Sequence, residues 1–366
     1  MITKKIALPL KQAIRNIFSE ILTQFMNYLL ILILGLVIGA VVMLFSGKDP
    51  ITAYAALWKG AFGNWYKLAD TLDRSTVLIL AGLAAAVAFR TSVFNLGLEG
   101  QLYIGAMAAA IVGFEVTGLP KVIHITLCLL AGIIAGGLWT LPVTYLRQRW
   151  NIPVMVPSLM LNYIGILFTG YLVSFPFKDP TATMAGTPVL ESTARLPKFI
   201  PGSTINIGFI IAIVVAILVY WFLFKTKIGY ELRIVGFNPS FAASSGMPVK
   251  RSVFLAMLIS GGLVGLGGAC MITGFFGRFL SSFSAGYGWD GMMISLLAQN
   301  HPLGVLPASI FYAALANGAL TMQSQTGVSQ QVVGMVKGAL MFFVTAQLFL
   351  NYFRGRIRKW KLTSAE

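Results

Sequence analysis

Charged side chains are scarce in this sequence, and acidic ones are the scarcest. Only 10% of the 366 residues are Asp, Glu, Lys or Arg, and Lys and Arg outnumber Asp and Glu by 27 to 11. An ordinary soluble domain has about a quarter of charged residues, so the composition excludes that class. With 57% hydrophobic residues and a mean hydropathy of +0.82, the sequence predicts a polytopic membrane protein.

Residues that carry chemistry are also few. The two cysteines, Cys128 and Cys270, both lie inside apolar runs, which favours buried thiols over a structural disulfide. The two histidines, His124 and His301, are far apart in the sequence, so we expect no metal site. The sequence contains no Gly-x-x-x-x-Gly-Lys-Ser/Thr loop for phosphates. We therefore expect no catalytic residues, no metal and no ATP bound by this chain.

The net charge of +16 would suggest nucleic-acid binding in a soluble protein. Here the basic residues are spread over the loops between apolar runs, which is typical of topology signals, and we expect no nucleic-acid partner. Most Lys and Arg residues fall on one side of the bilayer if the N-terminus is cytoplasmic. The sequence therefore predicts a multi-pass protein of the cell membrane with both termini in the cytoplasm.

Apolar runs separated by polar stretches predict about ten transmembrane helices. The polar turn from Asn300 to Pro302 also allows the eighth and ninth runs to form a re-entrant pair instead of two spans. The predicted spans are 26–45, 75–90, 100–117, 122–146, 153–175, 204–224, 252–274, 287–300, 303–320 and 328–352.

The predicted fold class is an all-α helical membrane bundle in three parts. These are a cytoplasmic N-terminal segment at 1–25, a transmembrane domain at 26–352 and a basic cytoplasmic tail at 353–366. Two segments inside the domain, 75–175 and 252–352, each hold four predicted spans and carry a polar stretch that glycines interrupt, SVFNLGLEGQ in the first and SAGYGWDG in the second. If their topologies are opposite, they form an inverted-repeat core, which places a transport path at the repeat interface.

Two long outer loops, 46–74 and 176–203, separate the predicted spans. The first contains Trp58, Trp65 and Tyr66, which are suited to the headgroup level of a bilayer. Contact with an extracellular partner and interfacial helices packed on the bundle are both open interpretations.

The longest polar segment between two apolar runs covers residues 225–251 and is strongly basic. An excess of Lys and Arg in a short loop is typical of the cytoplasmic face. The basic residues, which have Glu231 as the only acid among them, are Lys225, Lys227, Arg233, Lys250 and Arg251.

Apolar residues in this loop recur at helical spacing, so the sequence predicts a short amphipathic helix. Pro239 fits a first helical turn, and Gly246 followed by Pro248 would end the helix. Spacing alone leaves two interpretations open: a tethered surface helix that another protein holds, and an ordinary solvated loop. The apolar residues are Tyr230, Ile234, Phe237 and Phe241.

Polar side chains also occur between apolar spans. Asn95 and Glu99 lie four residues apart, with Gly97 and Gly100 beside them. They either line a transport path or cap a broken helix, where they would satisfy backbone groups that the glycines free. Asn162, in the middle of the fifth predicted span, leaves a similar choice between the path and a helix-to-helix hydrogen bond.

Three segments of the sequence together resemble one protein family. The second and third segments are FRTSVFNLGLEGQLYIGA at 89–106 and GYGWDGMMISLLAQNHPLGV at 286–305. The first lies in the basic loop and has the pattern Glu231, Arg233, Gly236, Asn238, Pro239, Ala242, Ala243 and Gly246. Across about residues 75–350 they resemble permease subunits of ABC importers in the branch for simple sugars and nucleosides. The pattern is most similar to the longer of the two permeases of nucleoside importers.

The resemblance implies a division of roles among subunits. This chain would form the translocation path with a second permease subunit. A cytoplasmic ATP-binding subunit would hold ATP and Mg, and an extracellular substrate-binding lipoprotein would deliver the substrate. Residues 225–251 would then couple the path to the ATPase, through Glu231, Arg233, Gly236, Asn238 and Pro239.

The resemblance also implies a small neutral substrate. Nucleosides, and purine nucleosides in particular, are implied, with simple sugars such as ribose or galactose as the alternative. Candidate path residues are Phe94, Asn95, Glu99, Asn162, Trp289 and Asp290. Aromatic rings that could stack on a base or sugar, or else belong to the core or the lipid surface, are Phe94, Phe275, Phe276, Tyr287 and Trp289.

A secondary transporter driven by protons or sodium is the rival interpretation from another class. In that case Glu99 or Asp290 would be the coupling carboxylate. Asp290 could also form a salt bridge with Arg278 that fixes an outer gate. A membrane-embedded enzyme is disfavoured, because the sequence has no cluster of nucleophiles or metal ligands.

Overall fold

The structure is a computed structural model, which describes residues 33–180, 184–199, 202–339 and 341–342. The predicted segments 1–25 and 353–366 lie outside the described residues, as do parts of the first and last predicted spans. The chain forms two compact units, one built from its two ends and the other from Leu57–Thr321. All the predicted site residues belong to the second unit.

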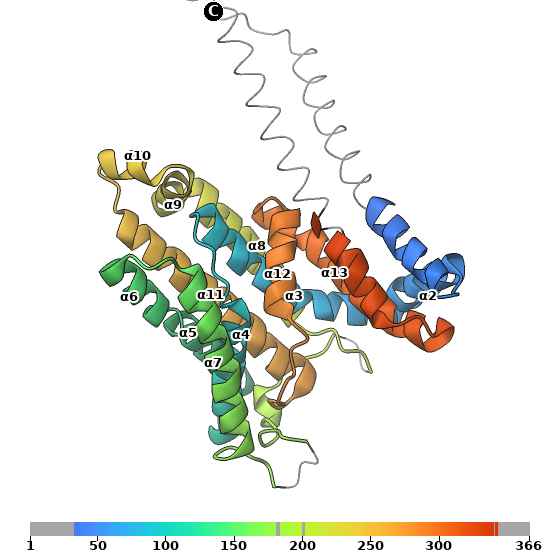
Figure 1. Cartoon of the computed structure of the whole chain (residues 1–366). Helices are drawn as coiled ribbons and strands as arrows, with labels where there is room; N and C mark the ends of the chain where they lie inside the picture. Colours follow the sequence, from blue (N-terminus) through green and yellow to red (C-terminus); the bar gives the residue numbers. More distant parts are fainter. Residues whose placement is uncertain (1–32, 181–183, 200–201, 340, 343–366) are drawn as a thin grey trace, which may run out of the picture. The chain divides into compact units, whose positions relative to one another are not determined.

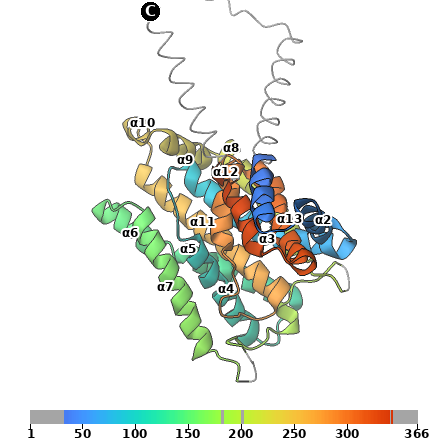
Figure 2. The same ribbon diagram turned by 45° about the vertical axis from the view of Figure 1, so that its right-hand side comes forward.

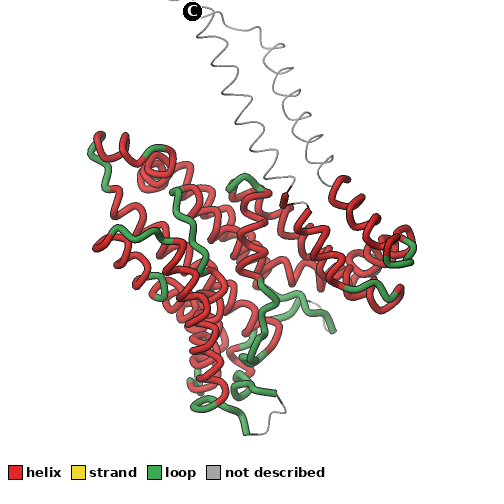
Figure 3. Tube along the Cα trace, in the orientation of Figure 1, coloured by secondary structure: helices red, strands yellow, loops and turns green. Residues whose placement is uncertain are grey.

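The regular structure of the described residues is helical throughout, which confirms the predicted fold class (Figures 1 and 3). Among these residues, 6 helices are long and apolar enough to cross a membrane. The predicted number of about ten transmembrane helices is therefore less exact than the predicted fold class. The 6 helices are α3 (Trp65–Arg90), α5 with α6 (Lys121–Leu138 and Leu141–Trp150), α7 (Met155–Ser174), α8 (Gly208–Lys225), α11 with the π-helical turn η2 (Val249–Met271 and Ile272–Phe276) and α13 (Pro302–Thr326). The other helices are Ile33–Phe45, α2 (Pro50–Phe62), α4 (Leu98–Glu115), the short η1 (Ser192–Ala194), α9 (Lys227–Phe237), α10 (Pro239–Ser244) and α12 (Tyr287–Leu297).

Helix α11 lies at the centre of the second unit, packed against α3, α4 and α5. Small residues allow the close approach. A Cβ atom on Gly136 would lie only 2.8 Å from the Cα of Gly265, and one on Gly132 would lie 2.9 Å from the Gly265 carbonyl oxygen. Larger side chains at these positions would force α5 away from α11.

Helix α3 begins at Trp65, well before the predicted start at residue 75, so the predicted outer loop 46–74 is wrong in its second half. Its charged first turns lower the local hydropathy, but they do not end the helix. Asn64 caps it, because the side-chain oxygen accepts a hydrogen bond of 2.9 Å from the Lys67 amide. Residues 50–62 of the same predicted loop form α2, one of the helices that the interfacial interpretation anticipated.

Helices α9 and α10 lie together at one end of the second unit, near the end of α3 (Figures 1 and 2). The sequence predicts one helix here, and the structure has two, separated at Asn238. The Asn238 side chain caps α10 by accepting a 3.0 Å hydrogen bond from the Phe241 amide. Pro239 occupies the first turn of α10, as predicted.

Helices α4 and α12 begin next to each other. Gly288, in the first turn of α12, packs directly against the backbone of Glu99 in the first turn of α4. Both helices follow an irregular stretch after a long helix, residues 91–97 in one case and 277–286 in the other. The inverted-repeat relation between 75–175 and 252–352 stays a prediction.

Candidate functional site

The exposed side chains of α9 and α10 form an apolar surface at one end of the unit. Gly229, Leu232 and Val235 face the bundle and are buried. Tyr230, Phe237 and Phe241, which the sequence placed on one helical stripe, are 49%, 91% and 58% exposed. We call these three residues the α9–α10 surface. An apolar surface that the chain leaves uncovered is typical of a contact with another molecule.

Gly236 fixes α9 to the end of α3. A Cβ atom at this position would overlap the carbonyl group of Arg90. The Ser92 hydroxyl donates a hydrogen bond of 2.5 Å to the Gly236 carbonyl oxygen. The absence of a side chain at residue 236 therefore brings the two backbones into contact.

Two guanidinium groups lie over the ring of Phe224, Arg233 at 4.9 Å and Arg90 at 5.3 Å from its centroid. Arg90 also donates hydrogen bonds to the carbonyl oxygens of Asn300 (3.0 Å) and Gln299 (3.4 Å). Gln299 and Asn300 form the turn between α12 and α13, and both have positive φ angles, 51° and 56°. Arg90 thus connects the end of α3, beside α9, to the start of α13.

His301 belongs to the same cluster, with its ring 5.5 Å from that of Phe224 and 5.6 Å from that of Tyr220. Burial and the neighbouring Arg90 guanidinium lower the pKa of His301. The imidazole is therefore neutral near pH 7 and adds no third cation to the two over Phe224.

Asn95 is fully buried and uses its whole hydrogen-bonding capacity inside the protein. Its amide nitrogen donates to Gln101 (3.0 Å) and to Ser260 (3.1 Å). Its oxygen accepts from the Gly97 amide and from the Gln101 side chain, both at 3.1 Å. Of the two interpretations of Asn95, the arrangement favours the structural one, since no polar group of the side chain is left for a substrate.

Glu99 and Asn162 have similar bracing contacts around the start of α4. The Glu99 carboxylate is 5% exposed and accepts a 2.5 Å hydrogen bond from the Gly288 amide in α12. The Asn162 oxygen, from α7, accepts a hydrogen bond from the Gly100 amide. These contacts satisfy first-turn amides that a broken helix leaves without partners, and a carboxylate is favoured there by the helix dipole.

The structure separates Phe94 from the other candidate aromatic residues. Phe94 is 45% exposed, pairs with Phe89 at 5.0 Å and lines a small cavity of about 210 Å³ beside Pro239. Trp289, 37% exposed, and Asp290 lie instead in the first turn of α12. The candidate path residues therefore belong to more than one site.

Arg278, which the sequence suggested as a partner of Asp290, forms an ion pair with Asp179 at 3.3 Å. This pair connects the loop after α7 with the loop after η2. The acid that pairs with Arg278 is therefore Asp179, in place of the predicted Asp290.

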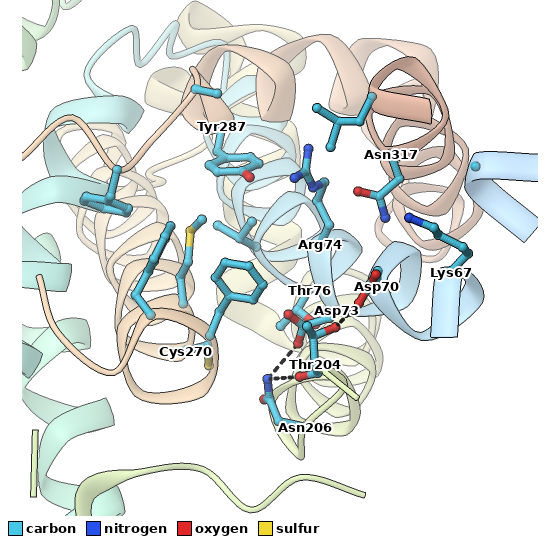
Figure 4. A pocket seen from close by; sticks show the side chains of 18 residues that line it. Lys67, Asp70, Asp73, Arg74, Thr76, Thr204, Asn206, Cys270, Tyr287 and Asn317 are labelled. Carbon is cyan, nitrogen blue, oxygen red and sulfur yellow. Dashed lines mark hydrogen bonds between the residues drawn. The ribbon is translucent and has the colours of Figure 1, made fainter. Parts of the chain in front are cut away.

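A cavity of about 490 Å³ lies at the first turns of α3, and the sequence analysis did not anticipate it (Figure 4). Helices α3, α12 and α13 and the segments around 204–206 and 270–285 all contribute to its wall. In the sequence, the cavity is indicated only by the charged residues that precede the apolar part of α3. The sequence analysis assigned these residues to the predicted loop 46–74. The polar lining residues of the cavity include Lys67, Asp70, Asp73, Arg74, Thr204, Asn206, Tyr287 and Asn317.

Hydrogen bonds order one wall of this cavity. Asn206 donates to the Asp73 carboxylate at 2.6 Å, and the Thr204 hydroxyl donates to Asp70 at 2.7 Å. The Asn206 oxygen in turn accepts from the Gly208 amide at 2.8 Å, at the start of α8. Figure 4 shows these groups on the side opposite Tyr287.

A helical bundle whose long helices are apolar enough to cross a membrane indicates a multi-pass membrane protein. In the described part of the chain there is also no cluster of metal-binding side chains. The chain belongs to the family of permease components named for branched-chain amino acid transport systems, whose sequence model matches residues 68–345.

Relatives with established names cover most of the chain. The guanosine ABC transporter permease protein NupP of Bacillus subtilis is 36% identical over 90% of this chain and 96% of its own length. The nucleoside ABC transporter permease protein NupB of Lactococcus lactis is 29% identical over 92% and 95%. The glucose ABC transporter permease protein TsgB13 of Haloferax volcanii is 30% identical over 87% and 86%.

Proposed function

We propose that this chain is the transmembrane permease subunit of an ATP-driven importer of nucleosides, with purine nucleosides as the main substrates. The observation that carries the proposal is the similarity to the guanosine permease NupP along 96% of its length. Simple sugars are the alternative substrate class, because the chain is also 30% identical to the glucose permease TsgB13. The chain itself would have no enzymatic activity, since ATP and Mg are bound by the partner ATPase.

The α9–α10 surface is the proposed contact for that ATPase. Tyr230, Phe237 and Phe241 offer uncovered apolar area, and the surrounding Lys and Arg residues suit the cytoplasmic face. When the ATPase closes on ATP, it would push α9 against α3 at Gly236. Because Arg90 connects α3 to the α12–α13 turn, movement of α9 would reach the helices around the path.

The coupling residues have separate roles in this scheme. Gly236 allows the close contact of α9 with α3, and Arg233 holds α9 over Phe224. Asn238 and Pro239 set the break between α9 and α10. Glu231, half-buried on α9, is the acid we expect to meet a basic group of the ATPase.

Other partners follow from the family. A second permease subunit would complete the path, and an extracellular binding lipoprotein would supply selectivity and affinity. The protein would span the cell membrane with α9 and α10 in the cytoplasm. Residues Arg90, Arg147, Arg149 and those of 225–251 would then share the cytoplasmic side, as the excess of basic residues requires.

Competition between substrates tests the proposed class. In cells that express the whole importer, excess unlabelled uridine or adenosine should suppress uptake of labelled guanosine, whereas excess ribose should not. Equal suppression by ribose would mean that the base contributes nothing to recognition, and the simple-sugar alternative would replace the nucleoside one. Cells that lack this chain provide the background rate.

A further inference from the structure

The cavity at the first turns of α3 is a ligand-sized space at the end of the unit away from α9. Asp73 and Arg90 lie on the same helix, and their separation of 17 residues corresponds to about 25 Å along the axis. A volume of about 490 Å³ lies within the range of small-molecule sites, roughly 300 to 1,000 Å³. If α9 is cytoplasmic, this cavity lies toward the outer side, where substrate arrives.

The formal charges of the residues that line the cavity cancel. Lys67 and Arg74 contribute two cations, and Asp70 and Asp73 contribute two carboxylates. A charged ligand would add a charge that no lining residue neutralises, in a partly buried space where such a charge is costly. A neutral ligand with many hydroxyl groups would not, and each hydroxyl can donate to a carboxylate while it accepts from an ammonium, guanidinium or amide group.

Asp73 is the buried acceptor best placed for such a ligand. It is 9% exposed, and Asn206 donates to one carboxylate oxygen, Oδ1. Among the described residues, none donates a hydrogen bond to its other oxygen. Asn206 is itself fixed by the Gly208 amide, so the position of the carboxylate is set by the protein. A preorganised carboxylate oxygen matches the adjacent hydroxyls of a ribose ring.

A second part of the lining is aromatic. Phe275, Phe276, Phe283 and Tyr287 line it, and Phe275 is 49% exposed. Aromatic faces bind flat heterocycles by stacking, with little preference among bases. A ligand with a hydroxylated ring at one end and a flat base at the other would use both walls, whereas a free sugar would use only the polar one.

We propose that this cavity is a weak nucleoside site of the permease, in which Asp73 and Asn206 bind the ribose hydroxyls and the wall around Phe275 and Tyr287 stacks on the base. The proposal rests on the proposed function and adds the location of the substrate. Weak binding suits an importer, because the external binding protein holds the affinity and the permease must release what it receives.

Protection from thiol labelling tests the site directly. The importer, made of both permeases and the ATPase without the binding protein, is placed in membrane vesicles with Cys270 replaced by Ala, because Cys270 also lines the cavity. Ala285→Cys, at an exposed residue of the cavity lining that the proposal does not assign to binding, is then labelled with a membrane-impermeant maleimide. Guanosine and uridine at millimolar concentration should slow the labelling, and ribose should slow it much less.

Two further variants give the test its controls. Adding Asp73→Asn should raise the guanosine concentration needed for protection about tenfold, because Asn has a single acceptor oxygen, to which Asn206 already donates, and its NH2 group cannot accept from a ribose hydroxyl. Glu191→Cys, exposed on the chain away from the cavity, should be labelled at a rate that guanosine does not change. Folding of each variant is checked by recovery of the assembled complex.

The outcomes separate this proposal from the proposed function. If the wild-type importer takes up guanosine but guanosine leaves the labelling of Ala285→Cys unchanged, the cavity is not a substrate site and the importer function stands. If ribose protects as well as guanosine does, the stacking wall is refuted. If the wild type transports glucose or ribose and no nucleoside, the proposed function itself is wrong.

Discussion

At the scale of single residues, the buried carboxylate of Glu99 braces two helices. It accepts a hydrogen bond from the Gly288 amide while it lies in the first turn of α4, so it serves the N-terminal ends of α4 and α12 together. A residue that carried protons would need a path to water and a group that exchanges them. The hydrogen bond from Gly288 joins the starts of α4 and α12, and we expect Glu99 to brace them and not to carry a coupling proton.

Replacing Glu99 by Gln should leave most transport intact. The amide oxygen of Gln can still accept from Gly288, so guanosine uptake should fall only modestly. Glu99→Leu should be worse, because an unsatisfied buried amide costs about 1–3 kcal/mol. Uptake and the thermal stability of the purified complex measure the two effects. Complete loss of uptake in Glu99→Gln, with proton-dependent transport in the wild type, would support a secondary transporter.

Gly236 offers a second test at this scale, because a single added methyl group meets the Arg90 carbonyl. Overpacking of this kind costs about 1–3 kcal/mol, so Gly236→Ala should reduce coupled uptake roughly tenfold while the protein still inserts. Gly170→Ala in α7 is the matched control, since no atom lies within 4 Å of its added Cβ. Equal uptake by the two variants would contradict the role of the α9–α3 contact.

At the scale of helices, the end of α3 contacts both α9, at Gly236, and the turn before α13, through Arg90. Arg90 contacts the ring of Phe224 and two carbonyl oxygens of a turn with left-handed residues. A planar guanidinium can make these contacts at once, and an ammonium group cannot. The connection therefore depends on the identity of the side chain and not only on its charge.

Arg90→Lys should separate ATP hydrolysis from transport. We expect the assembled complex to keep its ATPase activity while guanosine uptake drops, because the turn between α12 and α13 loses its fixed position. Arg149→Lys, exposed at the end of α6, serves as the control with the same change of chemistry. Parallel losses of ATPase activity and uptake in Arg90→Lys would indicate misassembly and contradict the proposed link.

Helix α3 shows why part of the site could not be predicted. The hydropathy of the sequence correctly predicted the apolar part of this helix. The basic residues of 225–251 and Pro239 predicted that a short helical segment lies where the structure has α9 and α10. The charged first turns of α3 read as a loop because their partners, Thr204 and Asn206, are more than a hundred residues away. A cavity whose walls come from six segments, α2 among them through Gly60, leaves no local pattern in the sequence.

At the scale of the whole molecule, composition and hydrophobic patterning were sufficient to predict the fold class. They were not sufficient to predict which contacts a buried polar side chain makes. The all-α membrane bundle follows from the apolar runs alone. The four hydrogen bonds of Asn95 favour a structural role for this side chain over a role in the path. Spacing along the chain could not distinguish these two uses of the same amide.

The central claim is that this chain forms the path of an ATP-driven nucleoside importer, and reconstitution tests it most directly. The chain is placed in proteoliposomes with its second permease and ATPase, and the binding protein and labelled guanosine are added on the outside. We predict uptake that requires ATP and this chain, and that an uncoupler does not reduce. Uptake by this chain alone, driven by a proton gradient and abolished by the uncoupler, would contradict the account.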